Sequence, residues 1–265
     1  MTILKKSLSQ HLIKDKNITD KMVRAAGVNA ADTVVEVGAG YGHLTRSLCE
    51  KAGLVYAVEF DRACLPFLEA LQEEHQNLRI VLGDILETPL HRFRIESNLK
   101  VIGNIPYQIT APILFKLLKE RAIIDNAYLT MQKEIALRIV SKPFTRAYGA
   151  ISAACQIFAD VKVLFLMKPG LFVPPPKIDS AFLSMEFKDK ERGTDDRLME
   201  FVRVCFQNKR KYLKYALSKH MGEEQIETLY RRMGFAASIR AEEIEPAKLK
   251  EMYLFLGAEG YWGMG

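Results

Sequence analysis

The stretch that decides the fold is Thr33-Val34-Val35-Glu36-Val37-Gly38-Ala39-Gly40-Tyr41-Gly42. Its first half is a β-branched apolar run, which is typical of a buried strand. The glycines of its second half allow positive φ angles and let the backbone approach a bound molecule closely. The segment from Leu44 to Lys51, which favours a helix, follows directly. A buried strand that leads through a glycine turn into a helix predicts the opening unit of a parallel α/β sheet.

The same alternation continues beyond this unit. Further strands are expected at Leu54 to Phe60, Leu78 to Leu82, Leu99 to Ile102, Ala127 to Met131, Lys162 to Met167 and Ile178 to Phe187. Helices are expected at Asp61 to Glu74, Ala111 to Lys119 and Gln132 to Val140. Continuous apolar strands between helices predict a parallel sheet that helices cover on both faces. The last strand alternates apolar and polar side chains, which indicates a position nearer the edge of the sheet.

The region after the sheet has two features of its own. Lys168 to Lys177 contains three consecutive prolines, which cannot join a helix or a central strand, so we expect a stiff loop that holds Phe172 in place. The charged segment from Lys188 to Thr194 predicts a domain boundary, with one domain at 1–190 and a small helical one at 191–265. The helices of the second domain are expected at Asp195 to Gln207, Lys211 to His220, Glu223 to Met233 and Pro246 to Leu256. The tail from Gly257 is expected to fray, and the alternative left open is that Trp262 docks back onto the domain.

The bulk composition is that of an ordinary globular protein. The 265 residues are 49% hydrophobic and 26% charged, and the net charge of +6 favours a polyanionic partner. No apolar run has the ~18 residues that a membrane span needs, and Met1 to Lys6 lack the apolar stretch of a signal peptide. We therefore predict a cytoplasmic protein without a membrane partner. The cysteines have no metal or redox spacing, so no metal site is predicted; they are Cys49, Cys64, Cys155 and Cys205.

The glycine turn and two acidic residues predict a cofactor site. The Gly-x-Gly-x-Gly spacing of Gly38, Gly40 and Gly42 differs from the Gly-x-Gly-x-x-Gly of nicotinamide enzymes. Such a turn can wrap the amino-acid end of S-adenosylmethionine. Glu59, at the end of the second strand, can accept both ribose hydroxyls, and Asp84, at the end of the third, can accept from the adenine amine. Taken singly, each has an alternative: a tight turn or a helix cap.

The fourth strand is followed by Gly103-Asn104-Ile105-Pro106-Tyr107. An amide, a carbonyl before the fixed proline ring and an aromatic face are the groups that grip a planar base bearing an exocyclic amine. The Asn104 side chain and the Ile105 carbonyl can accept the amine hydrogens, which frees the nitrogen lone pair, and an aromatic ring stacks on the base. With the cofactor site, this predicts an enzyme that methylates the amino group of a nucleobase. Carbon-5 pyrimidine methylation fits less well because the chain has no Pro-Cys pair.

The motifs closely resemble those of the KsgA-type ribosomal RNA adenine dimethyltransferases over residues 4 to 256. They are Gln10-His11-Leu12-Ile13, Glu36 to Thr45, Glu59-Phe60-Asp61, Gly83-Asp84, Asn104 to Tyr107 and Phe172-Val173-Pro174-Pro175-Pro176-Lys177-Ile178-Asp179-Ser180. One departure is Leu8-Ser9-Gln10, where the family has Phe-Gly-Gln. The resemblance implies an α/β fold, with a Rossmann-like class I methyltransferase sheet that binds S-adenosylmethionine and a small all-helical C-terminal domain.

The resemblance also implies the substrate and the site residues. Two methyl groups would be transferred to each of two adjacent adenines near the 3′ end of small-subunit RNA, and the protein would aid ribosome biogenesis. The residues implied at the cofactor are His11, Ile13, Gly38, Glu59, Asp84 and Asn104; those implied at the base are Asn104, Pro106 (through the carbonyl before it), Tyr107 and Phe172.

Two other functions stay open. One is the related large-subunit adenine methyltransferase of the macrolide-resistance type, which has the same catalytic motif. The segments Phe206 to Lys214 and Met233 to Ile244 resemble the KsgA-type C-terminal domain instead. The other is an RNA-binding assembly factor in which catalysis is secondary. The form of the substrate, naked RNA or an assembling subunit, also stays open, and nothing in the sequence requires more than a monomer.

The C-terminal part carries a basic stretch with Lys209, Arg210, Lys211 and Lys214, and two tyrosines are interleaved. Basic residues mixed with aromatic ones and without an intervening acid are typical of a surface that contacts RNA phosphates. The alternative is a solvated helix face, in which case the RNA surface would lie near Lys5, Lys6 and Lys14 or around Lys142 and Arg146.

Overall fold

The computed structural model describes residues 11–94, 98–188 and 195–262. These residues fall into two compact units. The first lies within Met1–Ala136 and Asp160–Lys190, and the second within Leu137–Ala159 and Glu191–Gly265. Residues 137–159 thus join the C-terminal helices, and the division of function at residue 190 stays a prediction. The motif Leu8-Ser9-Gln10 and the lysines at positions 5 and 6 lie outside the described residues.

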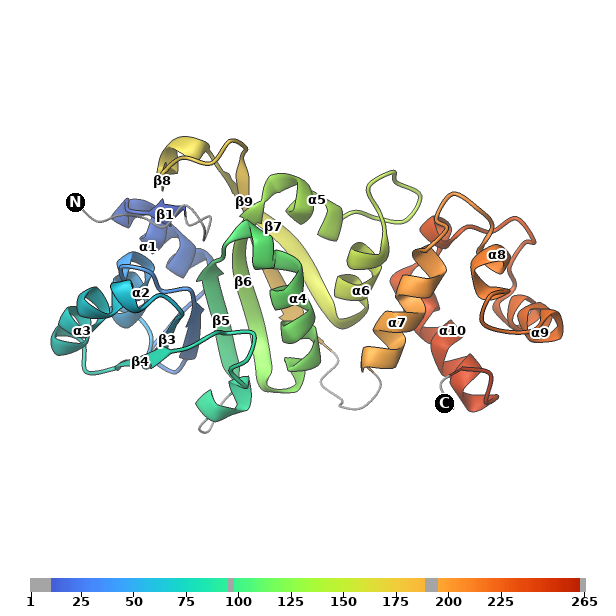
Figure 1. Ribbon diagram of the computed structural model, residues 1–265, viewed down its shortest axis with the longest axis horizontal. Coiled ribbons are helices and arrows are strands. Elements are labelled where there is room, and N and C mark those ends of the chain that lie inside the picture. Colours follow the sequence, from blue (N-terminus) through green and yellow to red (C-terminus); the bar gives the residue numbers. More distant parts are fainter. Residues whose placement is uncertain (1–10, 95–97, 189–194, 263–265) are drawn as a thin grey trace. The chain divides into compact units, whose positions relative to one another are not determined.

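The first unit is built on a seven-stranded sheet in the order β4-β3-β2-β5-β6-β9-β7 (Figure 1). The strands are β2 (Thr33–Val37), β3 (Leu54–Glu59), β4 (Leu78–Leu82), β5 (Leu99–Asn104), β6 (Ile124–Gln132), β7 (Ala159–Met167) and β9 (Ser180–Phe187). The pairs from β4 through β6 are parallel, and β9 is antiparallel to β6. All six further strands expected from the sequence are present. The edge strand is β7, and β9 lies one place inside it.

The helices of this unit follow the strands as expected for an α/β fold. They are α1 (Lys16–Ala25), α2 (His43–Cys49), α3 (Leu65–Glu74), α4 (Thr110–Lys119) and α5 (Lys133–Ile139), of which α5 runs into the second unit. α3 packs against β4, α4 against β6, and α1 against α2. The helix α1 has an Asp15 cap and one apolar face, with Met22 and Val23 buried, but it was not predicted from the sequence.

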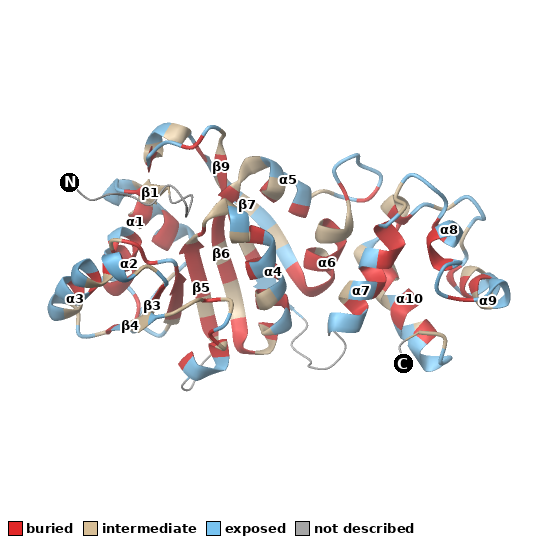
Figure 2. Ribbon diagram, viewed as in Figure 1, coloured by how far each residue is buried: buried red, intermediate tan, exposed pale blue. Residues whose placement is uncertain are grey.

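The core of the unit lies against the sheet. β5 and β6 are buried along most of their length (Figure 2). Such burial is expected in the parallel part of a sheet, because helices cover its faces. Val34 of β2 and Val55 of β3 are fully buried in one apolar cluster with Leu48 of α2. Burial of such side chains contributes about 1.5–3 kcal/mol each, so the strand ends that carry the site rest on a rigid support.

A second, two-stranded sheet pairs β1 (Leu12–Ile13) with β8 (Phe172–Val173) in antiparallel register. The rest of the proline-containing loop Lys168–Lys177 lies outside the sheets, as predicted. Its Pro169–Leu171 segment forms a 3₁₀ turn. The loop holds Phe172 in the core, where only 2% of the residue is exposed. The short strand itself was not predicted.

The second unit consists of helices. They are α6 (Ala150–Phe158), α7 (Asp195–Phe206), α8 (Leu213–Leu217), α9 (Glu223–Met233) and α10 (Pro246–Ala258). α6, α7 and α10 pack against one another, and α8 against α7. The expected helix from Lys211 to His220 is shorter than predicted, and α6 was not predicted. The prediction of a frayed tail is wrong for Trp262, because its ring packs edge-on against Phe201 at 5.1 Å between centroids.

Within the stretches that the structure describes, none of the helices combines the length and the apolar character that crossing a membrane would require.

Candidate active site

A cavity of about 240 Å³ opens at the carboxyl ends of the parallel strands β2, β3, β4 and β5. Ligands of open α/β sheets bind at this edge. The residues that line it are His11, Leu12, Val37, Gly38, Gly40, Val58, Glu59, Phe60, Gly83, Asp84, Ile85, Leu86, Asn104, Pro106, Gln108 and Ile109. The structure therefore brings together the glycine turn, both predicted acidic residues and Asn104, which are far apart in the sequence.

The glycine turn forms one wall of the cavity. Gly38 has φ +72° and Gly40 has φ +55°, both in the left-handed region that favours glycine. The amides of Gly38 and Ala39 donate to the Val58 carbonyl of β3, which fixes the turn to the neighbouring strand. A Cβ on Gly38 would meet no atom within 4 Å, so the space in front of this backbone is open to a ligand.

Glu59 lies at the end of β3, and only 4% of the residue is exposed. Its carboxylate accepts from the Gly40 amide and from the Asp61 amide, each at 2.7 Å. Each carboxylate oxygen has a further lone pair for a hydroxyl of a ligand. Glu59 thus holds the glycine turn in place and also presents acceptors to the cavity. Asp61 caps the following turn by accepting from the Ala63 amide.

Asp84 follows the carboxyl end of β4 and lines the same cavity as Glu59. Its Oδ1 accepts from the Leu86 amide at 2.8 Å, so the side chain has a local turn-stabilising role. The second carboxylate oxygen can accept from an amine in the cavity. The two roles are compatible, because a carboxylate has two oxygens and several lone pairs.

Glu36 is a buried acid beneath the glycine turn. Only 1% of the residue is exposed, and its Oε2 has no hydrogen-bond partner among the described residues. Burial raises the pKa of Glu36 to about 8; nearby Thr45 opposes the shift, and the Glu59 carboxylate adds to it. The side chain is therefore mostly protonated at neutral pH, which avoids a second buried negative charge beside Glu59.

Asn104 ends β5 with its side chain fixed. Its Nδ2 donates to the His11 carbonyl at 2.6 Å, which leaves Oδ1 as the acceptor of the amide in the cavity. Gly103, directly before it, pairs with Val37 of β2. A Cβ on Gly103 would lie 2.7 Å from the Val37 carbonyl oxygen, so only glycine lets β5 approach β2 closely enough to place Asn104.

The ring of His11, which lines the cavity, packs against the ring of Tyr107, which does not. The His11 and Tyr107 rings are 5.5 Å apart, and His11 Nδ1 lies 2.7 Å from the Pro174 carbonyl oxygen. The Tyr107 hydroxyl bonds Ser180 Oγ at 2.6 Å, and partial burial raises the pKa of Tyr107 despite that bond. The phenol therefore stays neutral and its ring is held at a fixed angle.

Three residues implied by the resemblance do not line the cavity. They are Ile13, Tyr107 and Phe172. Ile13 and Phe172 lie in the apolar core, where they pair across β1 and β8. Their assigned roles at the cofactor and the base stay predictions, as do those of the residues that do line it.

Phe60 also lines the cavity, although it was not among the site residues expected from the sequence. It is 64% exposed although its side chain is large and apolar. Its place directly after Glu59 was the available signal. A ring that solvent reaches at a cavity mouth can pack on a flat ligand.

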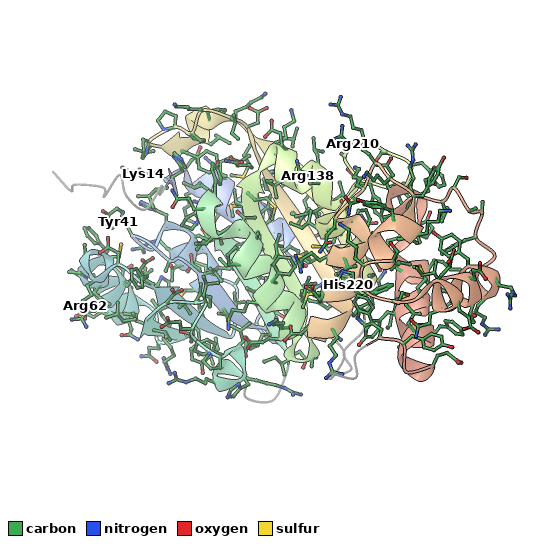
Figure 3. All side chains as sticks on the ribbon, turned by 45° about the vertical axis from the view of Figure 1, so that its right-hand side comes forward. Lys14, Tyr41, Arg62, Arg138, Arg210 and His220 are labelled. Atoms are coloured by element: carbon green, nitrogen blue, oxygen red, sulfur yellow. The ribbon has the colours of Figure 1, made fainter. Side chains whose placement is uncertain are left out.

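The four predicted RNA-binding residues differ in their surroundings. Lys209 Nζ donates to the Arg146 and Tyr148 carbonyls at 2.8 and 2.5 Å, and it lies 3.3 Å from a Glu242 carboxylate oxygen. Lys209 therefore braces a loop. The other three, Arg210, Lys211 and Lys214, are exposed, and Arg210 extends outward from the ribbon (Figure 3).

The residues present fit S-adenosylmethionine. Open glycine backbone, a buried carboxylate at the second strand and a carboxylate at the third offer places for an amino-acid group, ribose hydroxyls and an adenine amine. The fold and this site define an S-adenosylmethionine-dependent methyltransferase.

Comparison with known proteins identifies the family. A model of the family described as "Ribosomal RNA adenine dimethylase" matches residues 1–257, so the chain belongs to the ribosomal RNA adenine dimethylases. It is 41% identical over 211 residues to a Chlorobium luteolum protein named "Ribosomal RNA small subunit methyltransferase A", covering 79% of this chain and 76% of the relative. The enzyme class and the cofactor predicted from the sequence are thereby confirmed.

Solved structures confirm the fold. A dimethyladenosine transferase from Plasmodium falciparum superposes with a TM-score of 0.79 at 24% identity, covering 94% of this chain and 98% of the other. The 23S rRNA methyltransferase ErmE superposes with a TM-score of 0.70 at 22% identity, covering 93% and 99%. The fold is therefore common to enzymes named for different RNA substrates and does not separate them.

Proposed function

We propose that the protein dimethylates the amino groups of two adjacent adenines near the 3′ end of small-subunit ribosomal RNA. The observation that carries the chemistry is the hydrogen bond from Asn104 Nδ2 to the His11 carbonyl. Because this bond occupies the amide nitrogen, Oδ1 is left as the acceptor in the cofactor cavity. The small subunit as substrate is supported by the name of the Chlorobium luteolum relative.

The difficulty of the reaction lies in the nucleophile, because the adenine amine shares its lone pair with the ring. Acceptance of the amine hydrogens by Asn104 Oδ1 and the Ile105 carbonyl draws the nitrogen toward tetrahedral geometry. S-adenosylmethionine supplies a methyl group on a positively charged sulfur. In each transfer a nitrogen–carbon bond would form while the methyl–sulfur bond of the cofactor breaks. The sulfur would keep the bonding electron pair and leave as a neutral thioether, and the methylated nitrogen would give up one proton to solvent. Placing the nitrogen ~3–3.5 Å from the methyl carbon supplies much of the rate.

The base is held by stacking in this proposal. Tyr107, whose hydroxyl is bonded to Ser180 and whose ring packs on that of His11, is the ring proposed to stack on the base. Stacking of a base on such a ring is worth ~1–3 kcal/mol. Phe172 is only 2% exposed, so its contact with a base requires movement of the residues that cover it, among them Ile13 of β1.

The exposed basic residues Arg210, Lys211 and Lys214 are proposed to contact RNA phosphates, and Lys209 to support them by bracing the loop at Arg146 and Tyr148. Each free cation that neutralises a phosphate releases a counterion, which gives binding its salt dependence. An assembling subunit as the form of the substrate, a monomeric enzyme and a cytoplasmic location remain predictions.

Methylation of isolated ribosomal subunits tests the proposal. Small and large subunits from cells that lack the modification are incubated with the protein and labelled S-adenosylmethionine, and the modified bases are mapped. We expect label on two adjacent adenines of small-subunit RNA. Label on a large-subunit adenine would establish the macrolide-resistance type instead, and RNA binding without label would establish an assembly factor.

A further inference from the structure

Phe144 is an unusual residue in the second unit. It has φ +65°, and it is the only non-glycine residue with positive φ in the part of the chain that the structure describes. A left-handed conformation costs a bulky residue roughly 1–2 kcal/mol of stability relative to glycine. The side chain gains no burial in return, since 75% of the residue is exposed. Neither folding propensity nor core packing explains a phenylalanine here.

The surrounding structure holds this conformation from both sides. The Phe144 amide donates to the Glu242 carbonyl at 2.8 Å, and the Thr145 hydroxyl donates to the Lys142 carbonyl at 2.7 Å. Lys209 then fixes the following residues through the Arg146 and Tyr148 carbonyls. Strained residues that their surroundings hold in place cluster at ligand sites. The ring is thus presented to solvent on a firmly anchored loop.

The setting of the ring is basic and concave. Phe144 lines a surface hollow of about 930 Å³ together with Arg146, Arg210 and Lys211. Gln207 and Asn208 also line the hollow, as do Lys209 and Glu242, which form an ion pair. Arg146, Arg210 and Lys211 are exposed. Lys211 also lies over the Tyr215 ring, with its Nζ 3.9 Å from the ring centroid. An aromatic face among exposed cations and amides matches a polyanion that also carries flat rings.

We propose that Phe144 stacks on an unpaired base of the RNA substrate, while Arg146 and Arg210 contact the phosphates on either side of that base. The proposal rests on the proposed function, since it needs an RNA substrate. A protein partner fits less well, because one ring offers little apolar area and its neighbours carry positive charge.

Two substitutions at Phe144 test the proposal. Phe144→Gly removes the ring and relieves the backbone strain, so the protein should be at least as stable to urea as the wild type. Its affinity for an unmethylated small-subunit RNA fragment with unpaired nucleotides should fall by about 5- to 150-fold. Phe144→Tyr keeps a stacking ring and should bind within about 3-fold of the wild type. Leu254→Ala, which removes an exposed apolar side chain of α10, is the matched control and should bind normally.

The salt dependence separates stacking from charge. Phe144→Gly should leave the slope of log affinity against log salt unchanged, and it should not alter binding to a fully paired RNA duplex of the same length. Normal affinity of Phe144→Gly for the unpaired fragment, with a flattened slope when Arg210 and Lys211 are replaced by Gln, would overturn the stacking role and leave the RNA surface standing. If neither Phe144→Gly nor the replacement of Arg210 and Lys211 changes RNA affinity or its salt dependence, the RNA surface is rejected as well. Weaker binding to ribosomal particles with unchanged binding to naked RNA would point to a protein contact and overturn the proposal.

Discussion

The side chain of Asn104 is tied to the main chain of His11 by a 2.6 Å hydrogen bond from Nδ2 to the carbonyl oxygen. The two residues are 93 positions apart, and the bond joins the segment before β1 to the end of β5. Because the amide nitrogen is committed to His11, the amide oxygen is the part of the side chain available to an amine. The N-terminal segment thus sets the direction of the principal acceptor in the proposed reaction.

The first prediction concerns the glycine turn. Gly38→Ala should lower stability by roughly 1–2 kcal/mol because φ is +72°, and it should weaken S-adenosylmethionine binding at least tenfold because the new Cβ enters the cavity. Gly27→Ala is the matched control: Gly27 also has positive φ and open space around it, but it does not line the cavity. Urea unfolding and calorimetry measure both effects. Equal cofactor affinity in the two variants would contradict the role of the turn.

The second prediction concerns Glu59. Glu59→Gln keeps the size of the side chain but removes its charge and one acceptor, so cofactor binding should weaken by about 1.5–3 kcal/mol. RNA affinity should change much less. The exposed residue Glu87 gives the control, since Glu87→Gln removes the same charge without touching the cavity. Calorimetry that finds wild-type cofactor affinity in Glu59→Gln would refute this placement.

The third prediction is a pH dependence that originates at Glu36. Its pKa is about 8 in the folded protein and near 4.5 when unfolded, so between these values the folded state binds the extra proton. Stability therefore falls as pH rises through this window, and the loss is complete above pH 8. Glu36→Gln should remove that loss.

The urea midpoint at pH 5 and at pH 8.5 measures this effect. The gain from Glu36→Gln should be larger at pH 8.5 than at pH 5, by roughly 2–4 kcal/mol. Any packing cost of the new amide is the same at both pH values and cancels in the difference. An equal gain or loss at the two pH values would show that Glu36 is not held protonated.

The fourth prediction concerns the basic surface. Replacing Arg210 and Lys211 by Gln removes two exposed cations, and the slope of log RNA affinity against log salt should become shallower by about 1.4–1.8 in total. Replacing Arg231 and Arg232 of α9 removes the same charge from the same unit and should leave the slope nearly unchanged. Equal slopes for the two double variants would favour a solvated helix face.

The strands of the sheet were predictable because continuous apolar runs report burial directly. The glycine turn, Glu59, Asp84 and Asn104 were found for a related reason: each follows a buried strand, and parallel strands end at one sheet edge. The resemblance then supplied His11. The structure adds the hydrogen bond between Asn104 and His11. A local sequence pattern cannot predict this bond, because it joins two segments that are far apart in the chain.

Other features could not be found from local pattern. The short strands β1 and β8 exist only through their mutual pairing. The nine residues of α6 are almost wholly apolar, and so short an apolar run does not distinguish a buried helix from a buried strand. Phe144 reads as an ordinary loop residue, since neither its positive φ nor its exposure is encoded by its neighbours. The loop position follows from contacts to Glu242 and Lys209, about 60 to 100 residues away.

The most direct test of the account is a single-turnover measurement of methyl transfer by Asn104→Ala, with unmethylated small subunits and saturating S-adenosylmethionine. The account predicts a folded protein that still binds the cofactor and transfers methyl groups at least about a thousandfold more slowly than the wild type, since loss of one such hydrogen-bonding group costs about 10²–10³ in rate and Asn104 also positions the base. Asn98→Ala, which removes an asparagine bonded to Asp125 at the opposite end of β5, should transfer at the wild-type rate. A rate for Asn104→Ala within threefold of the wild type would contradict the account.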